Sequence, residues 1–261
     1  MNSDEITRLQ INVNGIVQGV GFRPFVLRLA TENNLNGFVR NSQSGVEIEV
    51  EGNSKDIDRF VTELREKAPP LSDIIHLETF YVAVQHSTQF EIIASTEEIG
   101  NQTLISPDVC ICNDCLDELF NPTNRRYLYP FINCTNCGPR LTIIENIPYD
   151  RKYTTMNKFE MCEECSKEYH DPHDRRFHAQ PNACPKCGPN VWLEQTESDV
   201  ILEKAEAITK AAKDLSDGKI VAVKGLGGFH LAVDAYNDEA IKKLRERKRR
   251  EEKPFAVMVQ N

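Results

Sequence analysis

The chain has 261 residues, of which 40% are hydrophobic and 27% are charged, a composition typical of globular proteins and sufficient for about two domains. Its formal net charge of -9 argues against a surface built broadly for nucleic acid or anionic lipid. No stretch approaches the roughly 20 apolar residues that span a bilayer, and the first residues lack the basic and apolar regions of a signal peptide. We therefore predict a soluble, cytoplasmic protein that neither enters a membrane nor has nucleic acid as its default partner.

The first segment, residues 8–93, alternates apolar strands with two amphipathic helical stretches, in the order strand, helix, strand, strand, helix, strand. This order predicts a split βαβ sandwich. The first helix is expected to begin near Pro24, which suits a first-turn position, and the second to have Ser54 as its N-cap. Between them we expect a hairpin whose turn is formed by residues 41–45, and after them a strand over residues 74–84.

A glycine-rich loop, GIVQGVGFR over residues 15–23, leaves the first predicted strand and enters the first predicted helix. Such a loop points successive backbone N–H groups at an anion, and Arg23 at its end is suited to hold two phosphate oxygens bidentately. The loop lacks the GK[ST] ending of a nucleotide P-loop. A phosphate site is one interpretation, and a tight structural turn with a solvent-facing arginine is the other.

A repeat follows a polar stretch, residues 95–109, that we interpret as a linker. CNDCLDELFNPTNRRYLYPFINCTNCGPR recurs 50 residues later as CEECSKEYHDPHDRRFHAQPNACPKCGPN. Each copy has the form C-x2-C-x18-C-x2-C, in which two knuckles aim four thiolates at one tetrahedral ion and leave no position for water. We predict two structural zinc sites, one at Cys112, Cys115, Cys134 and Cys137 and one at Cys162, Cys165, Cys184 and Cys187.

The sequence leaves alternatives open for which cysteine knuckles share an ion and for whether Cys110 or a histidine is a ligand. The duplication favours pairing of the knuckles within each copy, although an interleaved arrangement stays open. The ninth cysteine, Cys110, is interpreted as a free thiol, because a zinc site closes at four ligands. The first copy contains no histidine, so His170, His173 and His178 of the second copy are interpreted as surface residues rather than ligands.

An α/β pattern begins near residue 196. It predicts a helix from Ile201 to Leu215, strands over residues 220–223 and 231–233 around the loop KGLGGF, a charged helix over residues 238–250 and a buried-type strand over residues 255–259. About 60 residues of such a pattern are fewer than the usual 100 or more of a domain. We therefore expect this third segment to be incomplete.

The first segment resembles the acylphosphatase family at G-I-V-Q-G-V-G-F-R and at G-F-V-R-N-x-x-x-G-V-E. The resemblance covers about the first 93 residues and implies an α+β fold, the ferredoxin-like βαββαβ sandwich. It also implies that Arg23 binds the phosphate of an acyl phosphate and that Asn41 orients the attacking water, whereas Asn41 alone would be read as a hairpin-turn residue. The implied phosphate-binding residues are Gln18, Gly19, Val20, Gly21, Phe22 and Arg23. No general base is identified beside them.

The whole chain resembles one family, the hydrogenase maturation carbamoyltransferases called HypF, in the order of its parts. The last part is similar to the start of a YrdC-like α/β domain at KGLGGFHLAVDA and LRERKRREEKPFAVM. There Lys224, Lys248, Arg250 and Lys253 would face phosphates or a carboxylate, whereas the pattern alone favours a solvated, charged helix end. The expected domains are an acylphosphatase-like domain (1–94), a linker (95–109), two zinc fingers (110–145 and 146–195) and the incomplete YrdC-like segment (196–261).

This resemblance implies an acylphosphatase-type hydrolase acting on carbamoyl phosphate, as part of a carbamoyltransferase. In the family, carbamate is then adenylated with ATP and transferred to a HypE-type hydrogenase maturation protein. Most of the YrdC-like domain and all of the transferase domain are absent, so we expect no complete transfer, and ATP as a cofactor only in a completed chain. The alternatives are a zinc-dependent interaction scaffold with an inactive acylphosphatase-like domain and, disfavoured by the acidic balance, a zinc-ribbon nucleic-acid binder.

Overall fold

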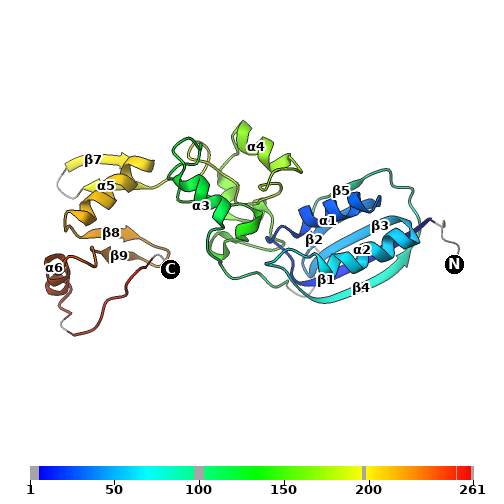
Figure 1. Ribbon diagram of the computed structural model, residues 1–261, viewed down its shortest axis with the longest axis horizontal. Helices are drawn as coiled ribbons and strands as arrows, with labels where there is room; N and C mark the ends of the chain where they lie inside the picture. The colour runs from blue at the N-terminus through cyan, green and yellow to red at the C-terminus, as the bar shows by residue number, and fades with distance from the viewer. Residues whose placement is uncertain (1–5, 97–102, 196–197, 251, 260–261) are drawn as a thin grey trace. The chain divides into compact units, whose positions relative to one another are not determined.

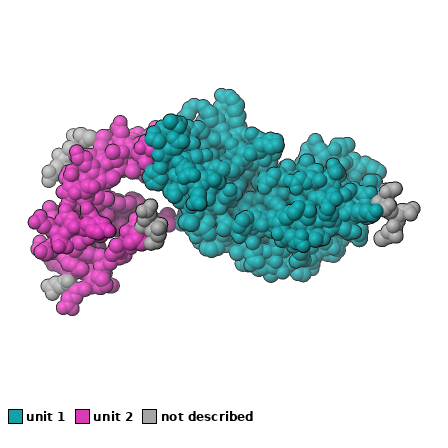
Figure 2. Space-filling model, viewed as in Figure 1, with its two compact units in different colours: residues 1–126, 130–189 teal, residues 127–129, 190–261 magenta. Residues whose placement is uncertain are grey.

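The computed structural model describes residues 6–96, 103–195, 198–250 and 252–259, without the side chains of residues 198–200. The chain divides into two compact units, one of residues 1–126 and 130–189 and one of residues 127–129 and 190–261 (Figure 2).

The first unit begins with a five-stranded sheet whose strand order is β4-β1-β3-β2-β5. Its elements are β1 (Ile6–Ile16), α1 (Phe22–Glu32), β2 (Asn36–Ser42), β3 (Gly45–Asn53), α2 (Ser54–Glu66), β4 (Asp73–Val82) and β5 (Phe90–Ile92). Both helices lie on one face of the sheet (Figure 1). Alternate residues of β1, such as Ile11 and Val13, are buried there with Val26 of α1 and Phe60 of α2. The predicted βαββαβ sandwich is confirmed, and β5 adds a short strand parallel to β2.

Two local predictions in this sheet were wrong. Ser42 pairs with Gly45, so the hairpin closes through a two-residue turn, and Asn41 lies inside β2 opposite Val46 rather than in the turn. The N-cap of α2 is Asn53, whose side chain accepts a hydrogen bond from the backbone N–H of Lys55. The amide oxygen of Asn53 thus satisfies a free N–H of the first turn, which is the capping role that Ser54 was expected to have.

The middle of the chain, also in the first unit, has little regular structure. It contains α3 (Asn113–Phe120), the 3-10 turns η1 (Thr135–Cys137), η2 (Leu141–Ile143), η3 (Arg151–Tyr153) and η4 (Thr155–Lys158), and α4 (Glu163–His170). The helices α3 and α4 begin just after Cys112 and Cys162, at the same place in the two copies of the repeat.

The described residues of the second unit form two pairs of antiparallel strands and two helices: β6 (Trp192–Gln195), β7 (Ser198–Glu203), α5 (Lys204–Ser216), β8 (Val221–Lys224), β9 (Phe229–Ala232) and α6 (Asp238–Lys248). The predicted helix start at Ile201 was wrong, because this residue lies in β7, paired with Glu194 of β6. Residues 255–259 form no strand and pair with no strand among the described residues, and Met258 is 97% exposed. None of the helices that the structure describes is long and apolar enough to cross a membrane.

A buried ion pair network lies on the face of the sheet opposite the helices. Arg8 is 1% exposed and donates hydrogen bonds to Glu49 (2.6 Å) and Glu51 (2.9 Å). The carboxylate of Glu51 also accepts the backbone N–H groups of Gln85 and Ser87, at 2.7 and 2.9 Å. Burial raises the pKa of Glu51, but these hydrogen bonds from Gln85, Arg8 and Ser87 outweigh it and leave the pKa below 4.5. Glu51 therefore fastens the segment after β4 to the sheet.

Replacement of Glu51 by Gln is expected to lower the free energy of unfolding at neutral pH by about 3 kcal/mol, because Arg8 loses a buried charged partner. Urea denaturation of the variant and the wild type measures the difference. Glu47→Gln is the matched control on the same strand, since Glu47 pairs with the partly exposed Arg40 and its loss should cost less than about 1 kcal/mol. Because the folded-state pKa of Glu51 is lowered, the gap should be full above pH 4.5 and shrink as the pH falls further. Equal costs for the two variants would contradict this assignment.

Candidate functional site

The glycine-rich loop between β1 and α1 is shaped by two residues with left-handed backbone. Gly19 has φ 74° and Gly21, the N-cap of α1, has φ 76°. A Cβ atom on Gly19 would lie 2.7 Å from Cβ of Pro139 and 2.9 Å from the ring of Tyr149. Position 19 therefore requires glycine, both for its backbone conformation and for close packing. The loop packs tightly against residues 103–189, which we call the finger region.

The side chain of Gln18 fixes this loop from inside. Gln18 is 2% exposed, and its amide nitrogen donates to the carbonyls of Ser42 and Gly45 in the β2–β3 hairpin. Its amide oxygen accepts the backbone N–H of Tyr149 at 2.7 Å. The side chains of Val20 and Phe22 are buried in the hydrophobic core. These residues can therefore contribute only backbone N–H groups to a bound anion.

Arg23 and Asn41 meet at the loop and line one small cavity of about 20 Å³. Arg23 is in the first turn of α1 and is 8% exposed, and Asn41 is on β2 and is 1% exposed. The amide nitrogen of Asn41 donates to the carbonyl of Tyr149 at 3.3 Å, whereas its buried amide oxygen has no partner among the described residues. A buried amide oxygen without a partner is costly, and a water in the cavity would satisfy it.

The finger region supplies the rest of the cavity wall. Asp150 forms an ion pair with Arg23, at 2.9 Å between Oδ1 and Nη1, and its other oxygen accepts a hydrogen bond from the hydroxyl of Ser95. The residues of this region that line the cavity itself include Tyr149, His178 and Gln180, whereas Asp150 reaches the site through its ion pair with Arg23. Sequence reasoning missed Asp150, because this residue lies between the two repeats in a stretch without a motif.

The prediction that all three histidines of the second repeat lie at the surface was wrong for one of them, His178. His170 and His173 are exposed, but His178 is partly buried between the rings of Tyr169 and Phe177. Burial, with a smaller contribution from the charge of Arg23, lowers the pKa of His178 to about 4. His178 therefore presents a neutral imidazole to the cavity at physiological pH.

The eight repeat cysteines form two clusters, each within one copy of the repeat. The sulfur atoms of each cluster lie within 4.8 Å of one another. Sγ–Sγ distances are 3.6 Å (Cys112–Cys134) and 3.9 Å (Cys134–Cys137) in the first cluster, and 3.6, 3.7 and 3.8 Å in the second. Four sulfurs about 2.3 Å from a central ion in a tetrahedron are about 3.8 Å apart, so both donor sets fit a tetrahedral metal. Cys110 is exposed and lies outside both clusters.

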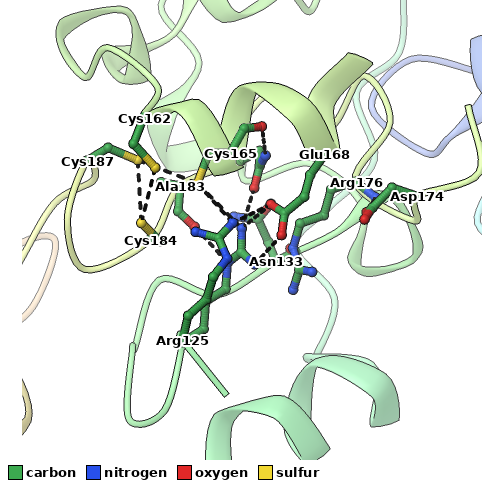
Figure 3. Close-up of polar contacts among 12 residues, drawn as sticks. Arg125, Asn133, Cys162, Cys165, Glu168, Asp174, Arg176, Ala183, Cys184 and Cys187 are labelled. Carbon is green, nitrogen blue, oxygen red and sulfur yellow. Dashed lines mark hydrogen bonds and ion pairs between the residues drawn. The ribbon is translucent and has the colours of Figure 1, made fainter. Parts of the chain in front are cut away.

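The Arg-Arg pair of each repeat reaches into the other repeat. Arg125 donates to Cys165 Sγ at 3.3 Å and to Glu168 at 2.6 Å (Figure 3). Arg126 is 2% exposed and binds both oxygens of Glu168, at 2.9 and 2.5 Å, and the carbonyl of Ala183. Burial raises the pKa of Glu168, but the hydrogen bonds from Arg126 and Arg125 outweigh it and bring the pKa to about 2.

The second pair makes the reciprocal contacts. Arg175 donates to Cys115 Sγ at 2.8 Å and pairs with Glu118 at 2.6 Å. Arg176, which is also buried, pairs with Glu118 and donates to the carbonyl of Asn133. The sequence showed the pair at the same place in both copies, but its role was not identified. We call these crossed contacts the finger interlock.

The residues predicted to bind a nucleotide lie in the second unit and are not brought together. Lys224 is exposed, with its Nζ 5.7 Å from the ring centroid of Phe229, and Lys248 is exposed at the end of α6. Arg250 lies 5.7 Å from the ring centroid of Phe255, and Lys253 is exposed. No contact in the part of the chain that the structure describes joins Lys224 to the other three, so their role stays a prediction.

Three family models match the chain. The model described as acylphosphatase matches residues 9–92, the model described as HypF finger matches residues 111–144 and 161–194, and the Sua5/YciO/YrdC model, described as telomere recombination, matches residues 213–261. An acylphosphatase of Staphylococcus haemolyticus is 43% identical over 68 residues, which are 26% of this chain and 76% of that protein.

The whole chain is similar to carbamoyltransferases. It is 52% identical over 256 residues to carbamoyltransferase HypF2 of Cupriavidus necator, which covers 97% of this chain and 32% of that protein. The probable carbamoyltransferase HypF of Methanocaldococcus jannaschii is also 52% identical, covering 96% of this chain and 33% of that protein. A crystal structure of full-length HypF in a phosphate- and nucleotide-bound form superposes with a TM-score of 0.89 at 54% identity, over 99% of this chain and 34% of that chain. The chain thus spans about a third of the length of these relatives.

The finger interlock predicts that Glu168→Gln destabilises the finger region by about 3 kcal/mol, because the substitution leaves the buried Arg126 without its carboxylate. Thermal or urea denaturation of the intact chain measures the loss. Glu163→Gln, the same substitution on the same helix, is the control, because Glu163 is exposed and pairs with the exposed Lys167. An exposed pair of this kind is worth less than about 1 kcal/mol. A loss no larger for Glu168→Gln than for the control would show that the interlock does not stabilise the fingers.

Proposed function

Because the chain belongs to the HypF family, as an N-terminal part with an acylphosphatase domain, two HypF fingers and the start of a YrdC-like domain, we propose that it hydrolyses acyl phosphates, with carbamoyl phosphate as the preferred substrate. The observation that carries the proposal is the small cavity at the glycine loop, where a buried guanidinium faces the same space as a buried amide oxygen that has no partner among the residues that the structure describes. The relatives' names as carbamoyltransferases support a carbamoyl group as the acyl part.

In this proposal the two side chains have separate tasks. The backbone N–H groups of the loop, at the N-terminus of α1, and the guanidinium of Arg23 bind the phosphoryl oxygens and stabilise the charge that they carry in the transition state. The amide oxygen of Asn41 accepts a hydrogen bond from the attacking water and orients it toward phosphorus. An amide is neutral, so it can do this without repelling the anionic substrate.

We propose that both cysteine clusters hold structural zinc. Four thiolates per ion leave no open coordination position, and the Sγ–Sγ distances suit the tetrahedral geometry that zinc prefers. The ion would join the two knuckles of each finger in a region with few aliphatic side chains. Reduced cysteines suit a cytoplasmic protein.

The later steps are proposals for the longer protein. ATP-dependent activation of carbamate and its transfer to a HypE-type hydrogenase maturation protein would need the parts of the relatives that this chain does not span. The alternative, an interaction scaffold with an inactive acylphosphatase domain, is favoured by one observation: Arg23 is already paired with Asp150. Binding of phosphate without turnover of carbamoyl phosphate would support this alternative.

Replacement of Arg23 by Ala is expected to lower the rate of phosphate release from carbamoyl phosphate at least about 100-fold, because a principal charge-stabilising donor is lost. Asn41→Ala should give a loss of similar order by misplacing the water. Arg28→Ala is the control, since Arg28 is exposed on the same helix, and it should keep the wild-type rate. Unchanged hydrolysis by the Arg23 variant would refute the assignment, provided that circular dichroism shows the fold retained.

Elemental analysis of the purified chain is expected to give two zinc ions per molecule. A strong chelator should then unfold the finger region, because metal binding supplies of the order of 10 kcal/mol of folding free energy per site in small zinc modules. Cys115→Ser should lower the zinc content toward one ion, while Cys110→Ser should leave it at two, since Cys110 lies outside the clusters. A metal-free chain that keeps its fold would overturn the zinc proposal.

A further inference from the structure

The cavity beside Arg23 is too small for the substrate that the proposed function requires. Its volume of about 20 Å³ admits a water molecule or two but not a phosphoryl group. The space next to the guanidinium is taken by the carboxylate of Asp150, which pairs with Nη1 of Arg23 at 2.9 Å. Both side chains are largely shielded from water, at 9% and 16% exposure, so this ion pair is only weakly screened.

The carboxylate of Asp150 is held in this place from its other side as well. Its second oxygen accepts the hydroxyl of Ser95, which lies beyond β5 in the acylphosphatase segment. The preceding residue, Tyr149, is fixed by Gln18 through its N–H and by Asn41 through its carbonyl. Asp150 is thus positioned by residues of the loop and of β2, the same elements that would bind the phosphate.

We propose that Asp150 competes with the phosphate of the substrate for Arg23. The phosphate must displace the carboxylate of Asp150 on entry, and Asp150 pairs with Arg23 again when inorganic phosphate leaves. This inference rests on the proposed function and adds a positioning residue to it. A carboxylate and a phosphate both accept charge-assisted hydrogen bonds from a guanidinium, so the two anions compete for the N–H groups of Arg23. A carboxylate that stays near the bound phosphate would also repel it.

As a consequence, the site binds phosphate less tightly than the loop N–H groups and Arg23 would bind it in the absence of the carboxylate of Asp150. Weak retention of inorganic phosphate favours turnover, because the product carries the same group that the donors recognise in the substrate. A structural role for Asp150, in which it merely orients Arg23, predicts the opposite effect on phosphate affinity when the carboxylate is removed. The sign of that change therefore distinguishes the two roles.

The test is a calorimetric titration of the intact, zinc-loaded chain with inorganic phosphate, for the wild type and for Asp150→Asn. The proposal expects the dissociation constant to fall about tenfold or more in the variant, because a unit negative charge a few ångströms from the anion is removed. An unchanged or higher dissociation constant would overturn it. Asp58→Asn removes the same charge from an exposed position on α2 and should leave the dissociation constant within about twofold.

A second variant covers the case in which Asp150→Asn does not fold. Ser95→Ala frees one oxygen of Asp150 without touching Arg23, and the proposal expects a smaller decrease in the same dissociation constant; an increase would overturn it. Hydrolysis of carbamoyl phosphate is measured on the same samples. If the wild type does not hydrolyse it, the proposed function fails, while the phosphate titration still decides the role of Asp150.

Discussion

Eight thiols gathered into two tetrahedral clusters hold the middle of the chain in place. This region has no sheet and only two short helices, so it cannot bury enough apolar surface to fold as an ordinary domain does. The clusters fix the two knuckles of each repeat, and the segments between the knuckles then carry side chains to defined positions. The cavity wall depends on this support, since Thr135 lies within a knuckle of the first repeat, and His178 and Gln180 lie in the segment that joins the two knuckles of the second.

The finger interlock explains how two such clusters can pack together. Four thiolates and one divalent ion carry a net charge of about −2, and a buried charge of that size needs partners. Each cluster receives an arginine from the other repeat, through Arg125 to Cys165 and through Arg175 to Cys115, at 3.3 and 2.8 Å. The adjoining glutamates, Glu168 and Glu118, orient the arginines. The duplication therefore produces a pair in which each copy partly neutralises the other, and one finger alone would lack all of these crossed contacts.

The sequence was sufficient to predict the sandwich and the cysteine clusters, because the residues that form them recur at a regular spacing. The alternation of apolar residues in β1 and the 3.6-residue period of α2 identify the sandwich, because both patterns report directly which face is buried. The cysteine spacing identifies the clusters for a similar reason. It was insufficient for Asp150 and His178, because their positions depend on how the finger region packs on the acylphosphatase segment. The sequence also placed Ile201 in the wrong element. The apolar spacing of α5 extends toward the N-terminus into β7, and no residue type marks the boundary between the strand and the helix.

The contacts of the glycine loop show that the acylphosphatase segment and the finger region line the same cavity. In an isolated sandwich, Gly19 and Gly21 would be required only for their left-handed backbone. Here Gly19 also lies against Pro139 and Tyr149, and a Cβ on Gly21 would lie 3.2 Å from Thr135. The loop is therefore covered on the side where an open phosphate site would face solvent. Access to Arg23 then depends on residues of the finger region, and under the proposed function these walls would limit the size of the acyl group that the site can hold.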